Sequence, residues 1–292
     1  MQRVIYLALA AAMFNACARP IANFSTPTEE TRAAKPVAFN NETEKAETYL
    51  WDFGDGNTST EISPEHRFMG SGTYTVKLTA TDAKGKTGSK ERKVTILRPD
   101  RCLVQIKTPM GDMLAEIYDR TPLHQDNFVK LVEQGFYDSL LFHRVIEGFM
   151  IQGGDPDSKG ASPGAMLGSG GPGYTIKAEF VDSLAHVKGA LAAARTNNPQ
   201  KRSSGSQFYI VQGREVSEQD LNNKEGRYNF RYPSYIREEY MEMGGTPFLD
   251  QEYTVFGRVI EGLEVIDRVA AVRTNTQNRP NEDVWMIIKL IR

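Results

Sequence analysis

The segment from residue 142 to residue 156 combines residue types that suit the recognition of a peptide. It places the cation of Arg144, the amide of Gln152 and the apolar side chains of Phe149 and Met150 beside glycines that permit close backbone approach. No nucleophile, acid and base pair or cluster of metal ligands accompanies them. This combination is typical of a shallow apolar pocket with a hydrogen-bonding rim, for which a prolyl peptide is the natural substrate.

Two further segments carry motifs of the same kind. Residues 204–210 read Ser-Gly-Ser-Gln-Phe-Tyr-Ile, and residues 248–257 begin with Phe-Leu-Asp and end with Tyr-Thr-Val-Phe-Gly. The three segments, in this order, resemble the motifs of the cyclophilin-type peptidyl-prolyl isomerases, and the resemblance covers residues 98–292. It implies a closed antiparallel eight-stranded β-barrel with flanking helices, and an enzyme that catalyses rotation about X-Pro peptide bonds.

The elements that position these motifs are predicted from the start of this region. Residues 104–111 alternate apolar and polar side chains and end in Pro-Met-Gly, which indicates a strand and a turn. Thr121 and Pro122, followed by the apolar positions within 127–131, predict a first helix.

The chemistry expected here is rotation about an X-Pro bond, which faces a barrier of about 18–20 kcal/mol because the amide nitrogen shares its lone pair with the carbonyl. In the twisted state the proline nitrogen becomes pyramidal and can accept a hydrogen bond. A donor at that point stabilises the twisted state selectively, and each 1.36 kcal/mol gained is worth about tenfold in rate. Arg144 is the predicted donor, since a guanidinium is always charged and presents a rigid fork. A structural ion pair is the alternative role.

An apolar cup for the proline ring is predicted by the same resemblance. Its residues are Phe149, Met150, Tyr209 and Leu249. Without the resemblance, ordinary packing in a β-sheet core would be the preferred interpretation of these side chains.

The rim of the cup is assigned in the same way. Gln152, predicted to act in catalysis together with Arg144, and Gln207 are expected to hydrogen-bond the substrate backbone. The chain at Ala194 and Arg195 is expected to form a ledge for the residues that precede proline.

Two further aromatic residues belong to the predicted substrate site. Phe248 stands where some family members carry a tryptophan that contacts cyclosporin, and Tyr253 stands where others often carry histidine. Both positions keep an aromatic ring, which favours retention of isomerase activity.

The first residues of the chain resemble an export signal. Arg3 supplies positive charge and residues 4–14 are mostly apolar, whereas a membrane span needs about 20 apolar residues. We therefore expect a signal peptide at 1–16. Residues 14–17 resemble a lipoprotein processing box, which predicts a lipid on Cys17 and a linker at 17–21; plain cleavage of a secretory signal is the alternative. The expected location is the bacterial cell envelope, with the membrane as a partner through the lipid anchor.

Residues 22–97 show a different pattern, of short strands separated by tight turns. The motif at 51–56, followed by residues 72–76, resembles the PKD family of immunoglobulin-like domains. The resemblance implies an antiparallel β-sandwich that serves as a spacer or binding module. Asp52 and Asp55 fall short of the roughly six to eight oxygens that calcium takes, so a turn-forming role is favoured.

Composition excludes several other function classes. The net charge of -2 over 292 residues gives no broad basic surface, so nucleic acid is not an expected partner. The glycine-rich run at 153–173 lacks the Gly-Lys-Ser/Thr ending of a phosphate-binding loop and is predicted to be a loop beside the pocket. The four histidines lack the spacing of metal ligands, so neither a metal nor another cofactor is predicted.

An insertion at about 214–245 departs from a minimal cyclophilin. It contains arginines and tyrosines, which interfaces enrich, and a long segment in a compact domain is often functional. Two roles of the insertion remain open: it contacts substrate proteins, or it forms a surface helix that packs on the barrel.

Two functions remain in view. The leading one is a membrane-anchored prolyl isomerase that acts on proline-containing peptides and unfolded proteins, and so assists the folding of exported or envelope proteins. The alternative is a prolyl-peptide binding or adhesion module without a catalytic role.

Overall fold

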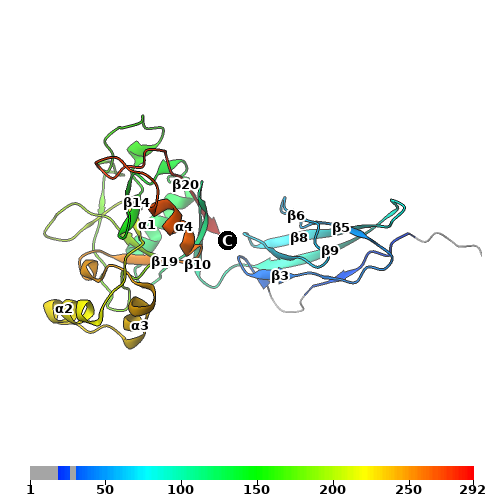
Figure 1. Cartoon of the computed structure of the whole chain (residues 1–292), viewed down its shortest axis with the longest axis horizontal. Coiled ribbons are helices and arrows are strands. Elements are labelled where there is room, and N and C mark those ends of the chain that lie inside the picture. Colours follow the sequence, from blue (N-terminus) through cyan, green and yellow to red (C-terminus); the bar gives the residue numbers. More distant parts are fainter. Residues whose placement is uncertain (1–18, 27–30) are drawn as a thin grey trace, which may run out of the picture. The chain divides into compact units, whose positions relative to one another are not determined.

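The computed structural model describes residues 19–26 and 31–292 (Figure 1). The chain divides into two compact units, with the boundary between Arg98 and Pro99. The predicted signal peptide at 1–16 and the predicted lipidation site at Cys17 lie outside the described residues. Within the described part, no helix is long and apolar enough to cross a membrane.

The N-terminal unit consists of short strands and turns. Its strands are β1 (Phe24–Ser25), β2 (Thr31–Arg32), β3 (Pro36–Ala38), β4 (Asn40–Asn41), β5 (Thr48–Asp52), β6 (Thr58–Ser59), β7 (Glu65–Arg67), β8 (Gly72–Thr81) and β9 (Thr87–Leu97). Five form a sheet in the order β2-β9-β8-β5-β6, and β1-β4 and β3-β7 are two-stranded sheets. The prediction of a wholly antiparallel arrangement is wrong at β2, which pairs with β9 in parallel. The strands β3 to β8 separate the two partners in the chain, so no hairpin sets their direction.

Aromatic side chains fill the core of this unit. Trp51 is fully buried, and its ring centroid lies 5.1 Å from that of Phe24 and 5.7 Å from that of Phe39. Its indole N–H donates to the carbonyl oxygen of Glu61 at 3.0 Å, which satisfies the one polar group of the ring. Leu50, the preceding residue, is exposed, as expected for a strand whose side chains alternate between two faces.

The turn after β5 uses both aspartates of the PKD-like motif. The Asp52 carboxylate accepts from the backbone N–H of Gly54 at 2.9 Å, and the Asp55 carboxylate accepts from that of Asn57 at 3.1 Å. The predicted turn-forming role of both residues is therefore confirmed.

The C-terminal unit, residues 99–292, carries the three sequence motifs. Its strands are β10 (Cys102–Thr108), β11 (Gly111–Ile117), β12 (Leu140–Leu141), β13 (Arg144–Ile146), β14 (Met150–Gly153), β15 (Thr175–Ile176), β16 (Ala190–Ala193), β17 (Ser203–Ser204), β18 (Phe208–Val211), β19 (Val255–Glu261) and β20 (Trp285–Ile291). Its helices are α1 (Pro122–Glu133), α2 (Glu218–Tyr228), α3 (Ser234–Met243) and α4 (Leu263–Ala270), with 3-10 turns η1 (Pro156–Ser158) and η2 (Pro247–Leu249). The predicted first strand and first helix are thus confirmed as β10 and α1.

Nine strands of this unit form one curled sheet in the order β12-β20-β10-β11-β19-β16-β18-β14-β13. The prediction of a closed eight-stranded barrel is wrong, because no ladder joins the edge strands β12 and β13 among the described residues. These two strands follow each other in the chain and are separated by Phe142 and His143 alone. The sheet therefore returns to its starting edge through a bend of the chain, which leaves an open half-barrel in place of a closed one. The broader prediction of a mainly β chain with few helices is confirmed.

The interior of the curled sheet is apolar and is covered by helices. Phe128 of α1 packs its ring 5.6 Å from that of Phe208 on β18 and 5.3 Å from that of Phe256 on β19. From α4, Val265, Ile266 and Val269 join the same buried cluster. Strands that carry site residues on one face are therefore fixed by packing on the other face.

The insertion forms two helices that pack on this unit, beside each other in Figure 1. Ser217 begins α2 with a capping box, since its hydroxyl accepts from the backbone N–H of Asp220 and the Asp220 carboxylate accepts from the backbone N–H of Ser217. The helices share a buried cluster with two residues of the preceding chain: Ala185, Val187, Val216, Leu221, Tyr232, Ile236 and Tyr240. Of the two interpretations left open by the sequence, packing against the isomerase unit is the one that the structure shows.

Candidate active site

All but two of the residues predicted to form the site surround one cavity of about 100 Å³. The residues that line this cavity are Arg144, Phe149, Met150, Gln152, Ala194, Arg195, Tyr209, Leu249 and Tyr253. They come from positions more than one hundred residues apart in the sequence. We call this cavity the proline pocket.

The register of three neighbouring strands brings the polar and aromatic parts of the pocket together. Arg144 on β13 lies opposite Gln152 on β14, and Gln152 lies opposite Tyr209 on β18. Directly opposed residues of antiparallel strands point to the same face of a sheet. The three side chains therefore form a row across the sheet, with the cation at one end and the phenol at the other.

A chain of hydrogen bonds orients the amide of Gln152. Its oxygen accepts from an Nη of Arg144 at 3.1 Å, and its nitrogen donates to the amide oxygen of Gln207 at 3.1 Å. The Gln207 nitrogen donates in turn to the carbonyl oxygens of Gly168 and Gly170. Gln207 thus connects Gln152 to the glycine-rich loop. Its predicted contact with the substrate backbone stays a prediction.

The floor of the pocket is apolar, as the sequence indicated. Met150, Tyr209 and Leu249 are each less than 10% exposed and pack in one cluster with the half-buried Phe149. Phe248 does not line the pocket. It is 54% exposed, and its ring centroid lies 5.7 Å from that of Phe149, so it stands at the margin.

The predicted ledge is fixed by an acidic residue that the sequence analysis did not identify. Arg195 donates to the backbone oxygen of Glu252 and to its carboxylate, both at 3.0 Å, and its guanidinium lies 4.6 Å from the ring centroid of Tyr253. Lys201 donates to the same carboxylate at 2.9 Å. Burial acts to raise the pKa of Glu252, but hydrogen bonds from Tyr228 and Lys201 prevail and lower it. The carboxylate therefore stays ionised and anchors the ledge.

A buried polar network supports the floor from below. The Tyr209 hydroxyl lies 2.9 Å from Nε2 of His186, whose Nδ1 lies 2.6 Å from the Asp250 carboxylate. Tyr232 and Tyr240 donate to the other oxygen of that carboxylate, each at 2.5 Å. Burial raises the pKa of Tyr209 and of Tyr240 well above the ordinary range, so both stay protonated. Nδ1 can donate to the Asp250 carboxylate while Nε2 accepts from the Tyr209 hydroxyl, which satisfies both contacts of the His186 ring.

Sequence reasoning missed this network for an identifiable reason. Asp250 directly follows Leu249 in the third motif, and this adjacency was the one available signal. His186 and the two tyrosines lie in segments without any motif, and their contacts depend on the packing of the insertion against the chain around His186.

The pocket offers a cation, an oriented amide and an apolar floor. Such a site can hold a proline ring and donate a hydrogen bond to its nitrogen, without breaking a bond. This is the chemistry that the row Arg144, Gln152 and Tyr209 is arranged to perform. Residues 103–290 match the family described as cyclophilin type peptidyl-prolyl cis-trans isomerase. The chain belongs to this family.

The predicted enzyme class is thereby confirmed, and a second match confirms the resemblance of the N-terminal region, since residues 17–96 match the PKD domain family. A bifunctional phosphatase/peptidyl-prolyl cis-trans isomerase of Streptococcus pyogenes is 39% identical over 62% of this chain, which spans 37% of that protein's length. A peptidyl-prolyl cis-trans isomerase of Staphylococcus epidermidis is 38% identical over 62% of this chain and 87% of its own length. A solved cyclophilin-type isomerase of Cryptosporidium parvum, in the presence of the dipeptide Ala-Pro, is 24% identical, covers 65% of this chain and 97% of its own, and has a TM-score of 0.46.

Proposed function

We propose that this cyclophilin catalyses cis-trans isomerisation of X-Pro bonds in unfolded exported proteins of a bacterial cell envelope. The observation that carries the catalytic part is the row formed by Arg144, Gln152 and Tyr209, which lines one pocket together with the buried side chains of Met150 and Leu249. The cation, the amide and the apolar floor therefore lie next to one another in one pocket. Rotation about a prolyl bond requires this arrangement.

The proposed mechanism assigns a separate task to each part of the row. The apolar floor holds the proline ring, so that rotation takes place in the chain before proline. Arg144 donates to the proline nitrogen as it becomes pyramidal, because the described residues hold no acceptor for this guanidinium other than Gln152. Gln152 limits the movement of Arg144, and Gln207 limits that of Gln152. The entropy of orienting the donor is therefore lost on folding and not during the reaction.

A turnover assay on the full chain with an Ala-Pro peptide tests the catalytic proposal. We expect the protein to accelerate the cis-trans isomerisation of the Ala-Pro bond, which takes tens of seconds without a catalyst. Tight binding of the peptide without turnover would support the alternative, a prolyl-peptide binding module, which the match to the PKD family favours.

The location rests on the first residues of the sequence. The apolar run at 4–14 and the processing box ending at Cys17 support export and lipidation. We expect the protein in the membrane fraction of the cell, and we expect the Cys17→Ser variant in the soluble fraction. A wild-type protein that is already soluble after export would refute the lipid anchor and leave the isomerase proposal intact.

A further inference from the structure

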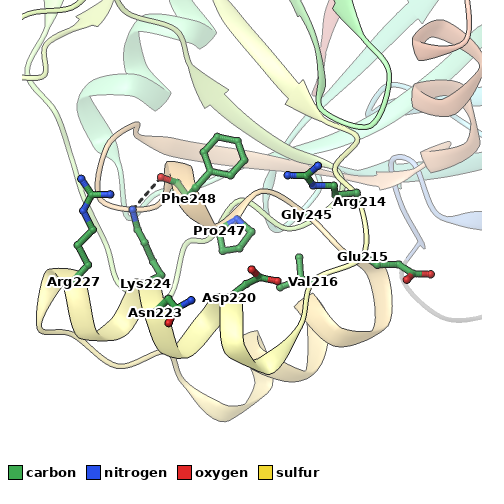
Figure 2. Close-up of a pocket in the computed structure, with 10 residues that line it drawn as sticks. All are labelled: Arg214, Glu215, Val216, Asp220, Asn223, Lys224, Arg227, Gly245, Pro247 and Phe248. Atoms are coloured by element: carbon green, nitrogen blue, oxygen red, sulfur yellow. Dashed lines mark hydrogen bonds between the residues drawn. The ribbon is translucent and has the colours of Figure 1, made fainter.

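A second cavity, of about 250 Å³, lies between α2 of the insertion, the chain directly before it and the segment that runs from Gly245 into η2 (Figure 2). We call it the insertion groove. Its lining residues are Arg214, Glu215, Val216, Asp220, Asn223, Lys224, Arg227, Gly245, Pro247 and Phe248. Phe248 joins the two cavities, because it lines the groove and its ring stands 5.7 Å from that of Phe149 in the proline pocket.

The most informative residue of the groove is Lys224. It is 6% exposed, and its ammonium lies 3.8 Å from the ring centroid of Tyr228. The ammonium carries three N–H donors, and one of them bonds to the backbone oxygen of Phe248 at 3.0 Å. Among the described residues no other hydrogen-bond acceptor is recorded for it. A buried cation with donors to spare is costly unless an anion completes its surroundings.

Two more cations flank this ammonium. Arg214 and Arg227 are exposed, and no hydrogen bond or ion pair with another described residue is recorded for either guanidinium. In Figure 2, Lys224 and Arg227 extend from α2 toward the side of the groove that holds Phe248, and Arg214 extends toward that side from the other flank. The three side chains thus present positive charge beside the ring that borders the proline pocket.

The carboxylates near these cations already have other partners. Asp250 and Glu252 favour the charged form of Lys224, but both accept hydrogen bonds from other side chains. Arg214 acts electrostatically on Asp220. Asp220 is engaged at the start of α2, where it accepts from the backbone N–H of Ser217 at 2.9 Å and from its hydroxyl at 2.6 Å. Glu215 points away from the other residues drawn in Figure 2. The end of the groove nearest to the proline pocket is therefore cationic.

We propose that the insertion groove binds the part of the substrate chain that follows proline and selects an acidic side chain there. This inference rests on the proposed isomerase function. The ledge at Ala194 and Arg195 is expected to receive the residues before proline, which leaves the border at Phe248 for the residues after it. An extended chain advances about 3.3 Å per residue, so a carboxylate a few positions beyond proline reaches Lys224 and its neighbours. A charged partner there gains hydrogen bonds about twice as strong as neutral ones.

The test uses the full chain and a series of peptides that contain one Ala-Pro bond. A single Glu is placed at each of the four positions after proline or the two before it, and each peptide is paired with the same peptide carrying Gln. We expect kcat/KM for Glu to exceed that for Gln about five- to tenfold at one or more positions after proline, and to equal it before proline. Equal values at all positions would overturn the proposal.

Variants of the groove residues test whether the preference for Glu over Gln arises in the insertion groove. In Lys224→Met and in the double variant Arg214→Gln/Arg227→Gln, we expect the Glu to Gln ratio to fall toward one. Lys107→Gln, which removes an exposed cation on β10 outside the groove, is the matched control and should keep the ratio of the wild type. If Lys224→Met does not fold, the double variant at two exposed positions still decides. A preference that survives in the double variant would contradict the assignment to the groove.

The two proposals fail in different ways. If no peptide is turned over, the proposed isomerase function is wrong, and affinities of the Glu and Gln peptides, measured by fluorescence titration, still decide the inference about the groove. If peptides are turned over without a preference for Glu, the isomerase function stands and the groove inference is wrong.

Discussion

The hydroxyl of Tyr240 donates to the carboxylate of Asp250 at 2.5 Å, and both groups are buried. Tyr240 belongs to α3 of the insertion, whereas Asp250 follows Leu249 in the floor of the proline pocket. Through His186 the same carboxylate is connected to Tyr209. The insertion therefore contributes to the support of the pocket floor.

The contribution of Tyr240 predicts a stability effect. In Tyr240→Phe, the buried Asp250 carboxylate loses one of its donors, which lowers the free energy of unfolding by about 1–3 kcal/mol. Urea denaturation measures the change. Tyr235→Phe is the control, since Tyr235 lies on the same helix and is 50% exposed. Equal midpoints for the two variants would show that the hydrogen bond contributes nothing.

The role of Arg144 predicts loss of activity without loss of fold. Arg144→Ala should lower kcat/KM on an Ala-Pro peptide by about 10- to 100-fold, because a hydrogen bond from a charged donor is worth about 1.5–3 kcal/mol. Its thermal midpoint should match that of the control Arg268→Ala, which removes an exposed arginine on α4. Near-normal turnover in Arg144→Ala would remove this residue from the mechanism.

His143 predicts sensitivity to acid. Burial lowers the pKa of His143 below its ordinary value near 6.5, while Asp155 and the backbone of Leu141 act in the opposite direction. The folded protein thus binds this proton more weakly than the unfolded chain, so stability is present above pH 6.5 and falls as the pH drops through the folded pKa. Urea midpoints between pH 7.5 and 5 should fall less in His143→Phe than in the wild type. Parallel slopes would contradict this assignment.

Lys224 predicts a change in the same direction on the alkaline side. Burial lowers the pKa of its ammonium to about 8 from an ordinary 10.5, although Asp250 and Glu252 oppose the shift and Arg227 and Lys201 add to it. Between these two values the unfolded chain binds the additional proton, so stability rises with pH in that window. The wild type should therefore gain stability relative to Lys224→Met from pH 8 to pH 10. A constant difference between the two proteins would show that the ammonium is well solvated.

The proline pocket could be predicted from the sequence because its residues belong to short motifs on regularly paired strands. Arg144, Gln152 and Tyr209 each lie within a motif, and strand pairing then aligns them. The path of the sheet at its edges could not be predicted in the same way. The edge strands β12 and β13 are separated by two residues, and the sequence pattern predicts that they pair. Whether they do so depends on the bend of the chain between them.

The insertion shows a second limit of sequence reasoning. Its arginines and tyrosines indicated an interface, but the pattern did not show that Tyr240 turns inward to Asp250 while Arg227 remains exposed. Both residue types occur at interfaces and in polar networks, and the choice between these roles is made by how α2 and α3 pack. The parallel pairing of β2 with β9 was missed for a related reason, since it joins segments distant in the chain.

The position of β20 has a consequence for the order in which the protein can mature. This strand lies between β12 and β10, so the last strand of the isomerase unit is the hydrogen-bonded neighbour of its first. On a ribosome, β10 emerges nearly two hundred residues before its partner. The isomerase sheet is therefore completed only after Trp285–Ile291 has been made, whereas the strands of the PKD unit are all available by Leu97. The PKD unit can therefore fold during synthesis, before the isomerase sheet is complete.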